Sequence, residues 1–163
     1  MKIAIYPGTF DPITYGHIDV INKSLNVFDK IVVATTDNVN KNYYFSIDER
    51  LTIINNSLFK DLKFSKNKVK VVSFDDLTID LCKKYKANTI IRGLRAVSDF
   101  EYEFQLAGMN KKLNSKIDTM FLMSDVENQI ISSKFVKEIT KLDGNINKFV
   151  TKSTVKMLKN KFK

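Results

Sequence analysis

The chain opens with the stretch Ile3-Ala4-Ile5-Tyr6-Pro7-Gly8-Thr9-Phe10-Asp11-Pro12-Ile13-Thr14-Tyr15-Gly16-His17, an apolar run followed by a Pro-Gly break and a Thr-x-Gly-His step. The apolar run predicts a buried first strand. Apolar residues then recur at spacings of three, four and three, which predicts a helix: Ile18, Ile21, Leu25 and Phe28. Free N–H groups and the positive dipole end at a helix start form an anion site. This strand-turn-helix therefore predicts phosphate binding, and His17, the only histidine, lies on its first turn.

Short apolar runs rich in β-branched residues recur along the chain, each followed by a segment of helical period: 2–6, 30–35, 69–73, 88–91 and 119–123. Continuous apolar strands of this kind are buried on both faces, as in a parallel sheet. The alternation predicts an α/β fold, a doubly wound, Rossmann-like, five-stranded parallel sheet with flanking helices. Because the chain has 163 residues and no linker or repeat, we expect a single domain over residues 1–163.

Capping signals indicate where connecting helices begin. Ser46-x-x-Glu49 and Ser98-x-x-Glu101 both match the capping box, in which a serine and an acidic side chain each accept the other residue's backbone N–H. Both sequences are followed by apolar residues at helical spacing. Further helices are expected near residues 78–86, 132–142 and 151–162.

The composition is that of an ordinary globular protein, with 44% hydrophobic residues and a formal charge of +9. The lysines are scattered along the chain, so we attribute the charge to a compositional bias and expect no nucleic-acid partner. No apolar stretch resembles a signal peptide or reaches membrane-spanning length, so no membrane association is expected. The single cysteine, Cys82, cannot form an internal disulfide, which suits a cytoplasmic protein, and we interpret it as a core residue.

Polar and basic side chains follow the ends of all the predicted strands. In open α/β sheets, ligands bind beyond the carboxyl ends of the strands. The candidates, in strand order, are Thr9 and His17, then Lys41, then Thr78, then Arg92 and Arg95, and finally Ser132 and Ser133. Their convergence on one sheet edge predicts a cradle for a triphosphate and a second phosphate.

Three separated motifs carry a resemblance to one enzyme family: 14–17 (Thr-Tyr-Gly-His), 92–103 (from Arg-Gly-Leu-Arg to Phe-Glu-Tyr-Glu) and 131–133 (Ile-Ser-Ser). The chain resembles the nucleotidyltransferases with a (T/H)xGH motif, and among them the bacterial phosphopantetheine adenylyltransferases. The resemblance runs from residue 3 to the final helix. It implies an enzyme of coenzyme A biosynthesis that transfers the adenylyl group of ATP to 4′-phosphopantetheine, giving dephospho-coenzyme A and pyrophosphate. The substrate phosphate would attack in line, without a covalent intermediate.

The resemblance also implies roles for individual residues. His17 would stabilise the transition state at the α-phosphate, with Lys41 and Arg92 as further catalytic residues. Substrate binding is implied for Thr9, Lys41, Thr78 and Arg92. ATP binding is implied for Thr9, Phe10, His17, Gly93, Leu94, Arg95, Glu103, Asn128, Gln129, Ile130, Ile131, Ser132, Ser133 and Lys134. Since similar enzymes are hexamers, a homohexamer is implied, with apolar contact expected from residues 100–109.

Two positions depart from the family pattern. Residues 42–45 lack the proline that commonly follows the lysine, and Lys134 stands where the family has Ser or Thr. Asp11 is interpreted as turn chemistry, since an attacking phosphate is already an anion and needs no general base. No His, Cys and Asp cluster has metal-ligand spacing, so no protein metal ligand is predicted and Mg²⁺ is expected to arrive with ATP.

Alternatives stay open for the site and for the function. Asp99, Glu101 or Glu103 could pair with the arginines, an interpretation that we favour for Arg95 over Arg92. The helix dipole favours a neutral imidazole in the first helix, whereas a bound phosphate favours the cation. Another adenylyl- or cytidylyltransferase of the same fold, or a non-catalytic nucleotide- or RNA-binding module, would also use a basic strand-turn-helix.

Overall fold

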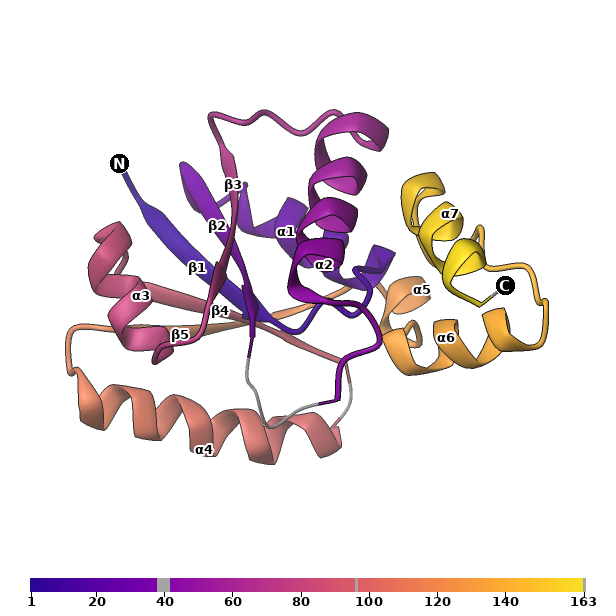
Figure 1. Ribbon diagram of the computed structural model, residues 1–163. Coiled ribbons are helices and arrows are strands. Elements are labelled where there is room, and N and C mark those ends of the chain that lie inside the picture. The colour runs from indigo at the N-terminus through magenta and orange to yellow at the C-terminus, as the bar shows by residue number, and fades with distance from the viewer. Residues whose placement is uncertain (38–41, 96, 163) are drawn as a thin grey trace.

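The computed structural model describes residues 1–37, 42–95 and 97–162, and it contains the predicted parallel sheet (Figure 1). The strands are β1 (Ile3–Gly8), β2 (Lys30–Thr36), β3 (Val69–Phe74), β4 (Thr89–Leu94) and β5 (Asp118–Met123). Their order is β3-β2-β1-β4-β5. The chain winds outward from β1 in one direction and then returns to add β4 and β5 on its other side. The switch point therefore lies between β1 and β4, as a doubly wound fold requires.

Helices cover both faces of the sheet. They are α1 (Tyr15–Ser24), α2 (Ile47–Asn55), the π-helix η1 (Asn56–Asp61), α3 (Thr78–Tyr85), α4 (Val97–Leu113), α5 (Val126–Gln129), α6 (Ser133–Lys141) and α7 (Lys152–Lys161). In Figure 1, α4 runs along one side of the sheet, and α6 and α7 lie together at one end of the molecule. Within the described residues, no helix is long and apolar enough to cross a membrane.

The sheet separates two apolar clusters because successive side chains of a strand point to opposite faces. Ala4 and Tyr6 of β1 belong to the cluster that includes residues of α1 and α2. Ile5 belongs to the cluster that includes residues of α3. Cys82 is fully buried in this second cluster, where burial raises the pKa of its thiol to about 11. The predicted role of Cys82 as a core residue is confirmed.

The predicted helix boundaries are confirmed in part. Ser46 accepts the Glu49 N–H and Glu49 accepts the Ser46 N–H, so the first capping box is present. The second prediction was wrong, because α4 begins at Val97 and Ser98 lies inside the helix. The prediction that the first helix extends to Phe28 was also wrong. It ends at Ser24, because the N–H of Leu25 is shared between carbonyls three and four residues back and those of Asn26 and Val27 bond three residues back, before the chain turns into β2.

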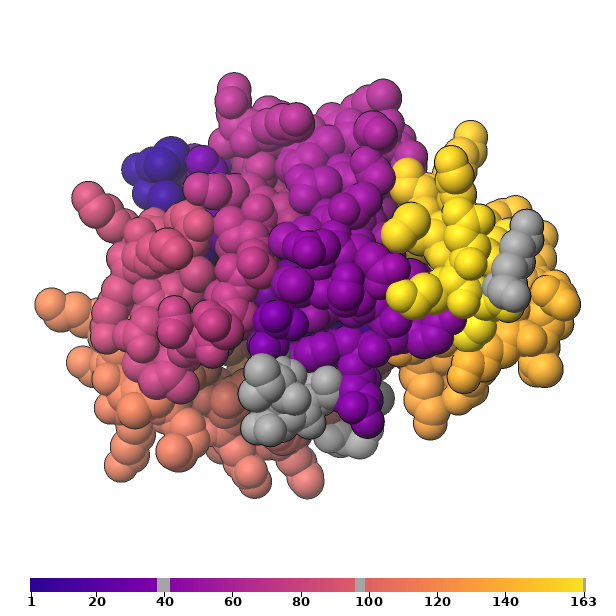
Figure 2. Space-filling view, in the orientation of Figure 1, coloured from indigo at the N-terminus to yellow at the C-terminus, as the bar shows by residue number. Residues whose placement is uncertain are grey.

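The last helix closes one side of the molecule. It contacts α2, η1 and α6, and Figure 2 shows its residues lying between those of α2 and α6. The Lys161 ammonium lies 2.8 and 2.9 Å from the two carboxylate oxygens of Glu49. The Phe162 ring stacks on Tyr44 with centroids 4.5 Å apart. The end of α7 is thereby attached to the segment that enters α2.

A buried arginine on α2 joins the loops at the carboxyl edge of the sheet. Arg50 is fully buried and its guanidinium donates to the backbone carbonyls of Thr9, Thr36 and Phe45. It also donates to the Thr35 hydroxyl, which in turn donates to the Thr9 carbonyl. One side chain thus connects the loop after β1, the end of β2 and the start of α2.

We predict that Arg50→Met lowers the free energy of unfolding by about 3 to 5 kcal/mol, the usual cost of breaking a buried charged network. The substitution removes the guanidinium donors from one buried and two partly buried carbonyls while keeping an unbranched apolar side chain. Urea unfolding followed by circular dichroism measures the change. Arg50→Lys keeps the charge with fewer donors, so its free energy of unfolding should lie between those of the wild-type protein and Arg50→Met. An unchanged unfolding midpoint for Arg50→Met would contradict this account.

Candidate active site

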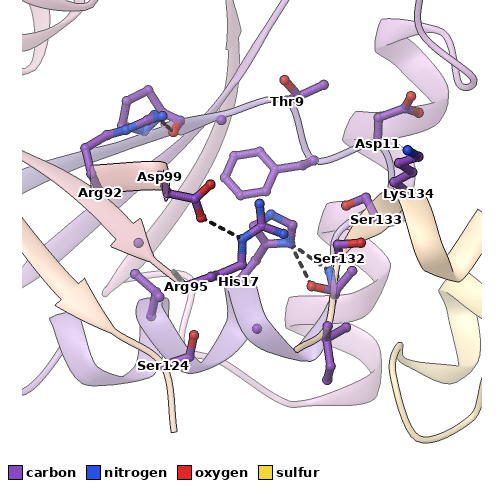
Figure 3. A pocket seen from close by; sticks show the side chains of 18 of the residues that line it. Thr9, Asp11, His17, Arg92, Arg95, Asp99, Ser124, Ser132, Ser133 and Lys134 are labelled. Atoms are coloured by element: carbon purple, nitrogen blue, oxygen red, sulfur yellow. Dashed lines mark hydrogen bonds and ion pairs between the residues drawn. The ribbon is translucent and has the colours of Figure 1, made fainter. Parts of the chain in front are cut away.

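A cavity of about 720 Å³ opens at the carboxyl edge of the sheet, around the switch point between β1 and β4. It is lined by residues from the loop after β1, the start of α1, the ends of β4 and β5, and the start of α6. This volume suits a nucleotide-sized ligand. Figure 3 shows His17 near the middle of the cavity, with Arg92 on one side of it and Ser132, Ser133 and Lys134 on the other.

The imidazole of His17 is held in one orientation by the start of its own helix. Thr14 is the N-cap of α1, and its backbone N–H donates to Nδ1 of His17 at 3.0 Å. Because Nδ1 accepts this bond, the neutral ring carries its proton on Nε2. Burial, together with the positive charges of Arg95 and Arg92, lowers the pKa of His17 to about 4. In the ligand-free protein the ring is therefore a neutral hydrogen-bond donor.

Phe10 packs against the other side of this imidazole. The two rings meet edge to face with centroids 5.1 Å apart, and the Tyr6 ring meets Phe10 edge to face with centroids 5.3 Å apart. Phe10 has a φ of 47°, which is uncommon for a bulky residue and turns its ring into the site. A Cβ on residue 8 would lie 2.9 Å from this ring, so glycine is required there. The Pro-Gly break thus makes room for the ring that supports His17.

Arg92 forms an ion pair inside the cavity. Its Nε donates to Oε2 of Glu103 at 2.7 Å, its Nη2 donates to Oε1, and its Nη1 donates to the Pro7 carbonyl. Burial alone would lower the pKa of this guanidinium, but the hydrogen bonds and charge of Glu103 raise it. The pairing that we expected for Arg95 is present, but our expectation that Arg92 is less suited to an acidic partner was wrong. Arg95 lies 3.4 Å from Asp99 in a looser, more exposed pair.

The start of α6 forms the opposite wall of the cavity. Ser132 is the N-cap and its hydroxyl accepts the Phe135 N–H, while the Ser133 hydroxyl donates to the Pro12 carbonyl. Both hydroxyls are therefore engaged with the backbone. The first backbone N–H groups of a helix have no partner within the helix, and together with the dipole they favour an anion. Lys134 is exposed at this rim of the cavity.

Asp11 bonds to segments far away in the sequence, whereas we expected it to act only within its local turn. Its carboxylate is 5% exposed and accepts the backbone N–H groups of Tyr44 and Phe45 at 2.8 and 2.9 Å. Lys137 of α6 lies 3.3 Å from the same carboxylate. Asp11 therefore ties the loop after β1 to the segment before α2 and to α6.

The cavity brings together most of the residues predicted for the site. Those that line it are Thr9, Phe10, His17, Arg92, Gly93, Arg95, Glu103, Ile131, Ser132, Ser133 and Lys134. Thr78, Leu94, Asn128, Gln129 and Ile130 do not line it. Lys41 lies outside the described residues, so its predicted role stays a prediction. The assignment of ligand contacts to the lining residues also stays a prediction.

Several lining residues were missed by the sequence analysis, among them Tyr43, Tyr102, Ser124 and Lys137. They occupy loops or helix faces where a polar or aromatic residue carries no distinctive signal. Arg50 was missed although a signal existed. It lies three and four residues before Ile53 and Ile54, on the buried phase of its helix, where a charged residue needs a reason.

Comparisons with known proteins show the family of this chain. The cytidylyltransferase-like family model matches residues 5–139. The chain is 68% identical to the phosphopantetheine adenylyltransferase of Pelagibacter ubique over 99% of this chain and 98% of that protein. It is 48% identical to that of Staphylococcus haemolyticus over 98% and 96% of the two chains.

The fold is also found among solved structures. The nicotinic acid mononucleotide adenylyltransferase of Plasmodium falciparum superposes with a TM-score of 0.72 at 21% identity, covering 98% of this chain and 96% of that one. This likeness supports the predicted Rossmann-like architecture. The chain therefore belongs to the cytidylyltransferase-like family and, within it, to the phosphopantetheine adenylyltransferases, the enzymes of coenzyme A biosynthesis that transfer an adenylyl group from ATP.

Proposed function

We propose that the cavity binds ATP and 4′-phosphopantetheine together and that His17 lies at the point of adenylyl transfer. The observation that carries this proposal is the position of the imidazole between an arginine end and a helix N-terminus in one cavity (Figure 3). The resemblance assigns the arginine end to the substrate phosphate and the helix end to the outer phosphates of ATP. The α-phosphorus would then lie beside His17.

The proposed reaction is a direct in-line displacement. An oxygen of the substrate phosphate attacks the α-phosphorus, a new P–O–P bridge forms, and the bond to the bridging oxygen of pyrophosphate breaks. In the transition state, the Nε2–H of His17 donates to an α-phosphate oxygen where negative charge accumulates. Because Ser132 and Ser133 are engaged with the backbone, neither is set up as a nucleophile. A covalent enzyme intermediate is therefore unnecessary.

Arg92 is proposed to bind the phosphate of 4′-phosphopantetheine. A guanidinium has more N–H donors than its bonds to Glu103 and Pro7 use, so it can hold the carboxylate and a phosphate together. Glu103 would then orient the guanidinium in addition to its predicted contact with ATP. Thr9, Thr78 and Lys41 remain proposed substrate contacts on the strength of the resemblance.

Magnesium is proposed to enter with the nucleotide. The acidic side chains of the cavity are already occupied by cations, since Asp11, Asp99 and Glu103 face Lys137, Arg95 and Arg92. Within the described residues, no group of three potential metal-ligating side chains lies together. This donor set fits an ion held by ATP phosphates and water, which is the usual environment of Mg²⁺. Bound in this way, Mg²⁺ would neutralise charge on the phosphates.

The family resemblance also supports a single-domain cytoplasmic enzyme that assembles as a homohexamer. Exposed apolar side chains on α4 support a role in that assembly. They are Phe100, Tyr102, Phe104, Met109 and Leu113, each more than 40% exposed. Large apolar side chains grouped on one exposed helix are typical of an interface between protein chains.

We predict that His17→Ala lowers kcat by about 10² to 10³, the usual effect of removing one transition-state donor. Pyrophosphate release from ATP is measured with 4′-phosphopantetheine and, in a parallel assay, with nicotinate mononucleotide. Wild-type protein should turn over only 4′-phosphopantetheine. Lys156→Ala, on the exposed side of α7, serves as the control and should retain wild-type activity. Near-full turnover by His17→Ala would refute the role of the imidazole.

His17 gives a direct titration experiment because it is the only histidine in the chain. We predict that its Hε1 resonance in the ligand-free protein has a titration midpoint near pH 4. The unfolded chain takes up this proton below about pH 6.5 and the folded protein does not, so the free energy of unfolding should decrease as the pH falls from 6.5 to 4. A midpoint near pH 6.5 would contradict the neutral donor.

We predict that Phe104→Glu reduces the mass of the particle in solution. A charge placed on an apolar interface costs more free energy than the contacts around it supply. Light scattering coupled to size-exclusion chromatography measures the mass. Leu142→Glu introduces the same charge at a residue that is 84% exposed outside α4 and should leave the mass unchanged. Equal masses for Phe104→Glu and wild-type protein would remove α4 from the interface.

A further inference from the structure

One face of α1 contacts the segment that connects β5 to α6. Gly16, Asp19 and Lys23 are spaced three and four residues apart, so they form a stripe along this helix. Each of them contacts residues between Met123 and Ile131 in a different way. The same helix carries His17, which lies between two members of the stripe.

Gly16 allows the two backbones to approach closely. A Cβ at this position would lie 3.1 Å from the Asn128 carbonyl oxygen and 3.6 Å from that of Ile131. The first of these distances is shorter than ordinary van der Waals contact. Glycine therefore seats the turn that leads to Ser132 directly on the first turn of α1.

Asp19 and Lys23 hold the beginning of the same segment. The Asp19 carboxylate, 12% exposed, accepts the Asp125 N–H at 2.6 Å. The Lys23 ammonium donates to the Met123 carbonyl at 2.8 Å and to the Asp125 carboxylate at 2.7 Å. The Lys23 ammonium also lies 3.4 Å from the Asp19 carboxylate, so the two opposite charges attract each other.

Hydrogen bonds within the segment make it rigid between the attachment at Asp125 and the cavity. The Asp125 carbonyl accepts the N–H groups of Asn128 and Gln129 at 2.8 and 3.0 Å. The Gln129 side chain donates to the carbonyl of Ser124, a cavity residue that is 4% exposed. Fixing Asp125 therefore fixes the turn, and the turn ends at the N-terminus of α6.

We propose that Asp19 and Lys23 are positioning residues for ATP, which hold the segment after β5 so that the N-terminus of α6 faces the nucleotide phosphates at a set distance from His17. This inference rests on the proposed function, in which the start of α6 binds the outer phosphates of ATP. Neither side chain lines the cavity, so each acts through the backbone that it holds. Arg92 is held instead by Glu103 and Pro7, which take no part in this attachment, so binding of 4′-phosphopantetheine should be insensitive to it.

Calorimetric titration with ATP and, separately, with 4′-phosphopantetheine tests the inference. Asp19→Ala should raise the ATP dissociation constant about tenfold and Lys23→Met about threefold, as expected for lost bonds to charged groups. Asp19→Asn keeps an oxygen for the Asp125 N–H and should recover part of the loss. Lys83→Met breaks an exposed pair with Asp80 on α3 and should change ATP binding by less than about twofold. The dissociation constant for 4′-phosphopantetheine should stay unchanged in all variants.

Unchanged ATP affinity in both Asp19→Ala and Lys23→Met would overturn the inference, as would equal weakening of both ligands. Thermal unfolding shows whether each variant is folded, and if Asp19→Ala fails to fold, Lys23→Met alone decides the outcome. The proposed function is judged separately, on the wild-type protein. Wild-type protein that binds ATP and releases no pyrophosphate with 4′-phosphopantetheine would refute the proposed function, and the variants' ATP affinities would still decide this inference.

Discussion

The buried guanidinium of Arg50 is the constraint on which the geometry of this site depends. Three carbonyls from separate loops converge on it, and without the arginine each would lose a donor at a buried or partly buried position. The nearest carboxylate, Asp37, is itself 46% exposed, so backbone dipoles supply much of the compensation. By fixing the Thr9 carbonyl, Arg50 fixes the loop that carries Phe10, and the Phe10 ring in turn supports the imidazole of His17.

The site combines an imidazole donor that is held in one orientation with arginines that are paired with carboxylates. Thr14 fixes the tautomer of His17, and burial together with the neighbouring arginines keeps its ring neutral in the ligand-free protein. A neutral imidazole can donate to a phosphate oxygen without first losing solvation as a cation. Aimed hydrogen bonds rather than proton transfer therefore account for the proposed chemistry.

The fold and much of the cavity could be predicted because their signals are periodic or local. Buried parallel strands produce apolar runs, and the Ser46 capping box needs only two side chains in one helical turn. The sequence offered three acidic candidates for the arginines but could not single out Glu103 for Arg92, because Glu103 reaches it only when α4 folds back along the sheet. The contacts of Asp11 with distant segments could not be predicted for the same reason. The left-handed backbone of Phe10 also had no signal, since bulky residues rarely adopt it.

The pairing of acidic and basic side chains in the cavity bears on how this protein selects among cellular anions. Arg92, Arg95 and Lys137 each face a carboxylate, so within the described residues the electrostatic field of the empty cavity is weaker than its number of basic residues suggests. A small ion such as inorganic phosphate gains little there, because the carboxylates already offset much of the positive charge. Discrimination then favours ligands with several linked phosphates or a long organic portion, which add further contacts across the cavity.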